Sequence, residues 1–223
     1  MICTASLEKN SPLVKRIRIK SLQIKNNIHI PKNIVIASHN LGKVKEINIL
    51  LNDIGIKALP ISFFSNKEPI EDGNDFKENA LIKARSAKKL SKMTSLADDS
   101  GLCIDALNGD PGIYSARWAG KDKNFKYAMA IIEKKLINLN NKKAHFICAL
   151  ALVTNEDKEY LYEGRVDGTL TFPPRGKKGF GYDPIFIPNN KKLTFGEMDP
   201  KQKNLISHRT HAFNKFKEHI IVK

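Results

Sequence analysis

The sequence predicts one large α/β domain, and three observations lead to this prediction. Apolar runs typical of buried strands occur at 34–38 (IVIAS) and 144–154 (AHFICALALVT). Stretches with apolar residues at helical spacing lie between and after these runs. The 223 residues, 41% of them hydrophobic and 27% charged, suffice for a sizeable core. We therefore expect one domain rather than two small lobes that share a sheet.

The positive charge of the chain favours polyanionic ligands. Lysine and arginine number 38 against 23 Asp and Glu, a net charge of +15, which favours nucleotides, nucleic acids or anionic membrane surfaces. Seven of the basic residues, but only one acidic residue, lie within residues 1–33. We expect this segment to be a poorly ordered or weakly helical extension, with a transit-like sequence as the alternative.

Cysteine usage and hydropathy favour a cytoplasmic protein. Cys3, Cys103 and Cys148 are scattered without metal-ligand spacing, which predicts reduced thiols. No apolar run approaches the roughly 18 residues that a membrane-spanning helix needs. We expect no membrane partner.

Residues 38–43 (SHNLGK) join the first predicted strand to a helix. Apolar residues recur at helical spacing from Val44 to Ile54, and Gly55 follows as a stop signal. A helix start here places free backbone N–H groups and Lys43 where a phosphate can bind. The segment is not a P-loop, because the first glycine of that motif is missing and Val44 follows the lysine. An ordinary loop is the alternative.

A second helix is predicted over 75–91. Asp75 and Glu78 have capping-box spacing, and the apolar residues that follow form one helical face. Glu71 and Asp72 lie in the turn just before this helix. Carboxylates at such a place are either dipole partners or metal ligands, and both alternatives stay open here.

The stretch 96–117 (LADDSGLCIDALNGDPGIYSAR) predicts a strand that delivers acidic residues to a site. Successive side chains on a strand point to opposite faces, so Asp98 and Asp99 cannot both face one pocket unless the strand ends there. One of them is then the working group. The alternative is an acidic Asp-Ser-Gly turn after a buried strand.

The second half of the chain predicts a helix and a long hairpin. Asp122 is a candidate cap for a helix over 124–138. The apolar run 144–154 is expected to pair in antiparallel fashion with 158–172 through the polar turn between them.

Two segments near the C-terminus carry candidate ligand-binding residues. Residues 173–188 (PPRGKKGFGYDPIFIP) alternate glycine and proline with aromatic residues, which predicts a formed binding loop whose aromatic rings could stack on a base, or else a rigid turn that packs its own rings. Asp199 and Ser207 predict the starts of two helices. Lys203, His208 and Arg209 then gather at the junction, where they either bind carbonyls or phosphates or are simply solvated.

Six motifs in order resemble the inosine/xanthosine triphosphate pyrophosphatase family over about residues 34–219. The motifs are SHNLGK, EDGxxFxENAxxKA, ADDSGL, PGIYSAR, GFGYDPIF and KNxISHR. The resemblance implies an elongated, two-lobed α/β domain over residues 34–223, built around a long twisted mixed sheet with flanking helices. It also implies a homodimer and Mg²⁺-dependent hydrolysis of a nucleoside triphosphate to the monophosphate and pyrophosphate.

The resemblance also implies roles for individual residues. Glu71 and Asp99 would bind magnesium, Asp99 would be the base that activates water, and Lys83 is a catalytic candidate. The residues expected to bind substrate are Ser38, His39, Asn40, Leu41, Gly42 and Lys43 at the triphosphate, Ser100, the loop Phe180, Gly181, Tyr182 and Asp183 at the base, and Lys203, His208 and Arg209 at the purine 6-oxo group.

The implied substrates are non-standard purine nucleotides such as ITP, dITP and XTP. Donors at the base favour a 6-oxo purine, because a 6-amino group would leave donors facing donors. One alternative is a related pyrophosphatase that acts on modified pyrimidine or methylated nucleotides. Another is an RNA-binding module that uses the positive charge, although we expect no specific nucleic-acid partner.

Overall fold

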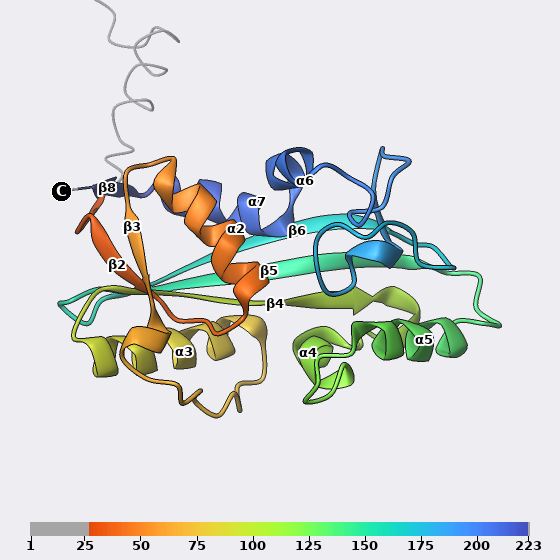
Figure 1. Cartoon of the computed structure of the whole chain (residues 1–223), viewed down its shortest axis with the longest axis horizontal. Helices are drawn as coiled ribbons and strands as arrows, with labels where there is room; N and C mark the ends of the chain where they lie inside the picture. The colour runs from red at the N-terminus through yellow and green to blue at the C-terminus, as the bar shows by residue number, and fades with distance from the viewer. Residues whose placement is uncertain (1–26, 223) are drawn as a thin grey trace, which may run out of the picture.

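A six-stranded mixed β-sheet runs the length of the molecule in the computed structural model, which describes residues 27–222 (Figure 1). The strand order is β3-β2-β4-β5-β6-β7. The strands are β2 (Asn33–Ile36), β3 (Lys57–Pro60), β4 (Ser95–Ile104), β5 (Lys143–Val153), β6 (Glu159–Leu170) and β7 (Phe186–Pro188).

The sheet is parallel at one edge and antiparallel at the other, and β4 belongs to both parts. β2 pairs in parallel with β3 and β4, whereas β5 pairs in antiparallel fashion with every residue of β4. β5 and β6 form the long hairpin that the sequence predicts. The strands β4, β5 and β6 therefore connect the two ends of the elongated molecule (Figure 1).

Helices cover both faces of the sheet. In Figure 1, α3 and α5 lie on one face, and α2, α6 and α7 lie on the other. The helices are α2 (Leu41–Asn52), α3 (Phe76–Ser91), α4 (Ser115–Trp118), α5 (Phe125–Lys135), α6 (Pro200–Ile206) and α7 (His208–Lys217), with 3₁₀ turns at Ile61–Phe63, Asp105–Leu107, Gly112–Tyr114 and Asp183–Ile185. No helix among the described residues is long and apolar enough to cross a membrane.

The hydrophobic core lies in separate clusters toward the two ends of the sheet. One cluster joins α5 to the far ends of β4 to β6 and to the segment around β7. Two others lie on opposite faces at the end that carries β2, under α2 and α7 and under α3. This arrangement confirms the α/β fold that the family resemblance implies, a single domain whose two lobes share one sheet.

Local signals in the sequence explain most of the helix starts. Asp75, Asp199 and Ser207 cap α3, α6 and α7 as predicted, each accepting a backbone N–H of the first turn. The predicted cap Asp122 is wrong. Asn124 caps α5 instead, because its side chain accepts the N–H of Tyr127.

The predicted strand that carries Asp98 and Asp99 is confirmed, and the alternative of an acidic Asp-Ser-Gly turn is wrong, because β4 continues to Ile104. β5 supplies partners along the whole stretch, including Cys148 for Ser100 and Ile147 for Gly101. A Cβ at Gly101 would lie only 2.3 Å from the Gly112 carbonyl oxygen. Glycine therefore serves a close approach here rather than a turn.

The folded domain begins earlier than residue 34. Strand β1 (Ile28–Ile30) pairs in parallel with β8 (Ile220–Val222), and Ile28 and Ile30 are buried against the α7 side of the core. The expectation of poor order up to residue 33 is therefore wrong for this last part. The rest of that expectation concerns residues 1–26, which lie outside the described residues.

We predict that Ile30→Ala lowers the free energy of unfolding by about 2–4 kcal/mol, because it removes a fully buried side chain and leaves a cavity. His29→Ala, at an exposed position of the same strand, is the matched control and should change stability by less than about 0.5 kcal/mol. Urea unfolding of the two variants measures this. Equal stabilities would show that β1 does not contribute to the fold.

Candidate active site

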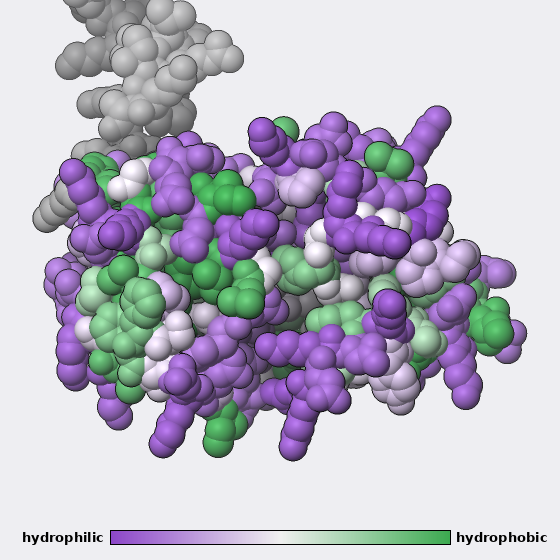
Figure 2. All heavy atoms as spheres, in the orientation of Figure 1, coloured by the Kyte–Doolittle hydropathy of each residue, from purple (hydrophilic) through white to green (hydrophobic). Residues whose placement is uncertain are grey.

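A cleft opens at the middle of the sheet, between the two lobes. Figure 2 shows this face hollowed there, with hydrophilic side chains around the opening. The cleft is lined by β4, by the loops that begin α2 and α3, by α4, by the loop of residues 173–188, called the aromatic loop below, and by the α6–α7 junction. These elements come from nearly the whole described chain, and β4 lies at their centre.

Most of the residues predicted for the site line this cleft. They are Ser38, His39, Asn40, Lys43, Glu71, Lys83, Asp99, Ser100, Phe180, Gly181, Tyr182, Asp183, Lys203, His208 and Arg209. Leu41 and Gly42 do not belong to the lining. The side chain of Leu41 is 84% exposed at the first turn of α2.

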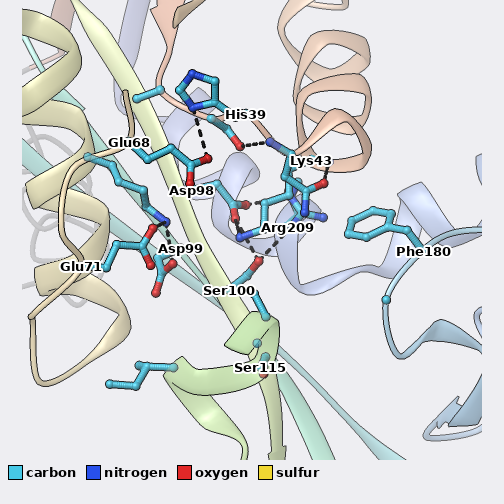
Figure 3. Close-up of a pocket in the computed structure, with 18 of the residues that line it drawn as sticks. His39, Lys43, Glu68, Glu71, Asp98, Asp99, Ser100, Ser115, Phe180 and Arg209 are labelled. Atoms are coloured by element: carbon cyan, nitrogen blue, oxygen red, sulfur yellow. Dashed lines mark hydrogen bonds and ion pairs between the residues drawn. The ribbon is translucent and has the colours of Figure 1, made fainter. Parts of the chain in front are cut away.

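Asp98 and Asp99 face opposite sides of β4, as alternation along a strand requires (Figure 3). The expectation that both cannot face one pocket is wrong, because Asp98 and Asp99 both line the cleft. The buried carboxylate of Asp98 pairs with Lys43 at 2.8 Å and with Arg209 at 2.7 Å. Ser100 donates to it at 2.9 Å and the Cys148 thiol at 3.0 Å.

The ionisation of Asp98 follows from these partners. Burial by itself raises the pKa of this carboxyl, but Arg209 and Lys43 outweigh burial and hold the pKa well below its ordinary value. Asp98 is therefore a permanent anion at neutral pH. It joins the start of α2, at Lys43, to the start of α7, at Arg209.

Glu46 belongs to the same network and was missed by the sequence reasoning. It accepts from Lys203 at 2.9 Å and from Arg209. Although burial raises the pKa of Glu46, the two cations lower it below its ordinary value. Its place three residues after Lys43, one helical turn on, is the signal that could have identified it.

Lys203 and Asp183 complete this group of charges. Lys203 Nζ lies 2.6 Å from the Asp183 carboxylate and 4.8 Å from the centre of the Phe180 ring. Asp183 also accepts the backbone N–H of Phe180 at 2.8 Å. Asp183 thus orders the aromatic loop and holds Lys203, both through its Oδ2 atom.

On the other face of β4, Lys83 bridges two carboxylates. Its Nζ lies 2.6 Å from Asp99 and 3.1 Å from Glu71. Burial alone lowers the pKa of Lys83, but the attraction of Asp99 and Glu71 raises it above its ordinary value. Lys83 is therefore a cation at neutral pH, which favours charge balance over proton transfer.

The Asp99 and Glu71 pair fits a magnesium ion. Asp99 Oδ2 is buried and has no hydrogen-bond partner, so one oxygen is free to bind a ligand. Mg²⁺ typically takes one or two carboxylates and completes its shell with phosphate oxygens and water. Within residues 27–222 no group of three or more His, Cys, Asp and Glu side chains could hold a metal, so a substrate would have to supply further ligands.

Two of the N–H groups expected to be free at the start of α2 are already bonded within the protein. The Asn40 side chain accepts from the N–H groups of Gly42 at 3.0 Å and Lys43 at 3.2 Å. Asn40 is an efficient helix cap and competes with any anion for these donors. The Lys43 ammonium, paired with Asp98, is the charged group that this loop brings to the cleft.

The aromatic loop is built to keep Phe180 and Tyr182 in the cleft. A Cβ at Gly42 would lie 2.7 Å from the Phe180 ring, so glycine allows this ring to pack on the start of α2. Tyr182 packs edge-on against Phe125 and donates to the Ser115 carbonyl at 2.9 Å. The loop is therefore formed, as the sequence predicts.

His208 is a neutral, buried ring. It stacks on Phe146 with ring centres 4.8 Å apart, and its Nδ1 has no hydrogen-bond partner. Burial is the main cause that holds the pKa of His208 well below its ordinary value, and repulsion from Arg209 and Lys203 lowers the pKa further. An uncharged ring nitrogen is thus left available inside the cleft.

This shift predicts a pH dependence of stability. An unfolded histidine binds a proton near pH 6.5, whereas folded His208 does so only at lower pH. The free energy of unfolding is therefore unaffected by His208 above about pH 6.5 and decreases as the pH falls below that value. Between pH 7 and pH 5, His208→Gln should reduce the slope of unfolding free energy against pH by up to about 1.4 kcal/mol per pH unit. Urea unfolding at several pH values measures the slope. Equal slopes for the two proteins would contradict the buried neutral state.

Comparisons with known proteins agree with one another. The model of the Ham1 family matches residues 34–219. A Bradyrhizobium diazoefficiens protein named dITP/XTP pyrophosphatase is 47% identical over 201 residues, which cover 85% of this chain and 95% of that protein. A Caulobacter vibrioides protein of the same name is 49% identical over 186 residues, covering 82% and 95%.

Solved structures give the same result. A HAM1 protein from Coxiella burnetii superimposes with a TM-score of 0.76 at 40% identity and covers 83% of this chain and 96% of that chain. The Staphylococcus aureus Ham1 protein gives a TM-score of 0.75 at 36% identity, with the same coverage. Both the sequence and the fold match along nearly the whole of these relatives. The chain therefore belongs to the Ham1 family.

Proposed function

We propose that this protein hydrolyses non-standard purine nucleoside triphosphates, such as ITP, dITP and XTP, to the monophosphate and pyrophosphate with Mg²⁺. The observation that carries the proposal is the buried carboxylate Asp99, with one unpartnered oxygen, in the same cleft as the donors Arg209 and His208. The relatives named dITP/XTP pyrophosphatase support this substrate class. A nucleic-acid-binding role gives no reason for buried carboxylates.

The acidic side of the cleft would perform the hydrolysis. Glu71 and Asp99 would hold the metal, which when bound supplies charge neutralisation and a more acidic water. Burial raises the pKa of Asp99 above its ordinary value despite the Lys83 cation, and a carboxylate with a raised pKa is a better general base. Asp99 would accept the proton of the attacking water.

The cations would position the triphosphate and stabilise the leaving pyrophosphate. Lys83 stays charged beside Asp99 and Glu71, and Lys43 lies on the other face of β4. Preorganised cations that face the developing charge lower the barrier without reorganisation during the reaction. Ser38, His39 and Asn40 would shape the wall of this subsite, since all three line the cleft.

The other side of the cleft would select the base. Arg209 uses one N–H on each of its three nitrogens for Asp98, Glu46 and Ser100. A guanidinium has five N–H donors, so two remain for a purine 6-oxo group. Phe180, held by Gly42 and Lys203, would stack on the base.

We predict that Asp99→Asn lowers the rate of pyrophosphate release from ITP by at least about 100-fold, because it removes both a metal ligand and the base. Binding of a non-hydrolysable ITP analogue with Mg²⁺, measured by calorimetry, should persist. Asp105→Asn is the matched control, because Asp105 is an exposed carboxylate just beyond the end of the same strand. Near-normal turnover of Asp99→Asn would refute its role.

We also predict that kcat/KM for ITP and XTP exceeds that for ATP by at least about 100-fold. A 6-amino group would place donors against the remaining Arg209 donors, and mispaired buried polar groups are costly. A panel of ITP, XTP, GTP, ATP and dUTP, assayed for pyrophosphate, measures this. A preference for dUTP would favour the alternative enzyme that acts on pyrimidine nucleotides.

The family resemblance also favours a homodimer, and the cysteine usage favours a cytoplasmic location. The homodimer adds no residue to the proposed chemistry, because the cleft of a single chain contains both the carboxylates and the base-binding donors.

A further inference from the structure

Glu71 belongs to a segment with no regular structure. Residues 64–75, between the 3₁₀ turn that follows β3 and the start of α3, contain no helix or strand. Lys83 attracts the Glu71 side chain, which is 34% exposed. Asp99, in contrast, is held within β4, which pairs with β5 at this position. The two proposed metal ligands therefore differ greatly in how firmly the fold holds them.

The backbone of Glu71 is held by an arginine from the opposite wall of the cleft. Arg117 Nη2 donates to the Glu71 carbonyl oxygen at 2.6 Å. The guanidinium carbon also lies 4.9 Å from the centre of the Tyr114 ring, which restricts its orientation. Arg117 is part of α4, which lies on the α5 side of the molecule in Figure 1, whereas the Glu71 segment leads into α3.

Helix α4 is itself fixed to β4. The buried Ser115 hydroxyl accepts the Leu102 N–H at 2.9 Å and donates to the Gly112 carbonyl at 2.7 Å. The Tyr182 hydroxyl donates to the Ser115 carbonyl. The Ser115 hydrogen bonds therefore fix the position of Arg117 relative to Leu102, which is only three residues from Asp99 on β4.

We propose that Arg117 is a positioning residue that sets the separation of the Glu71 and Asp99 carboxylates through the Glu71 backbone. The inference rests on the proposed function, because it assigns these carboxylates to Mg²⁺. Two like charges repel each other, and the Lys83 bridge acts only on the side chains. The Arg117 hydrogen bond supplies the backbone constraint, and partners of metal ligands typically change affinity by about 10- to 100-fold when removed.

The test compares Arg117→Gln with Arg165→Gln and wild type in the full-length protein. Arg165 is the matched control, because it is another exposed arginine that pairs locally with Asp167 on β6. Calorimetry with Mn²⁺ as the probe measures metal binding without turnover. Hydrogen–deuterium exchange over residues 66–74 measures the order of the Glu71 segment, and pyrophosphate release is measured as a function of Mg²⁺.

For Arg117→Gln we expect Mn²⁺ binding about 10-fold weaker or more. The Mg²⁺ concentration for half-maximal rate should rise by a similar factor while kcat at saturating Mg²⁺ stays near the wild-type value. Exchange over 66–74 should be faster. Arg117→Lys, which keeps the charge but loses the planar fork, should show a smaller change in the same direction.

Unchanged Mn²⁺ affinity in Arg117→Gln would overturn the inference, as would a fall in kcat at saturating Mg²⁺ with unchanged affinity. A wild-type protein that binds Mn²⁺ but releases no pyrophosphate from any nucleotide would overturn the proposed function instead. The binding and exchange measurements would still report on Arg117 in that case. Equal effects in Arg165→Gln would show a general loss of surface charge and also overturn the inference.

Discussion

Asp98 is the charge on which the arrangement of the cleft depends. Its carboxylate is buried and accepts from Lys43, Arg209, Ser100 and Cys148. Removal of one member of such a buried group typically costs about 3–5 kcal/mol, because the remaining charge is left without a partner. Asp98 therefore joins the start of α2, the centre of the sheet and the start of α7 in one unit.

The charges around Asp98 balance. The carboxylates of Asp98, Glu46 and Asp183 face the cations Lys43, Lys203 and Arg209. Because each cation is already paired, its side chain has one geometry before a ligand arrives, which lowers the entropy cost of binding. The buried charges are thus better understood as positioning devices for the cleft than as a source of stability.

The long strands and the loops contribute differently to the site. β4 holds Asp98, Asp99 and Ser100 within a paired strand, so their relative positions follow from strand geometry. The Glu71 segment and the aromatic loop have no such ladder. They depend on individual side-chain contacts, such as Arg117 to Glu71 and Asp183 to the Phe180 amide. Sites of this kind are as precise as the contacts that support them.

Local patterns were enough to predict much of this protein. The hairpin of β5 and β6 and the caps of α3, α6 and α7 follow from alternation and capping chemistry, which act within a few residues. The errors arose where a distant partner competes. Ser100 and Gly101 have the composition of a turn but pair with β5. No local signal predicts the strand Ile28–Ile30, because its partner β8 is almost 200 residues away in the sequence.

By itself the sequence determined the α/β class, the two opposite faces for Asp98 and Asp99, and a set of candidate site residues most of which line the cleft. Only the tertiary structure decided which of these groups are free. Lys43, Lys203 and Arg209 are paired inside the protein, two N–H groups of α2 are bonded to Asn40, and Glu46 is a full member of the network. The physical reason is that hydrogen bonds and ion pairs are satisfied in space, and the partners of these cleft residues come from segments up to 163 residues apart.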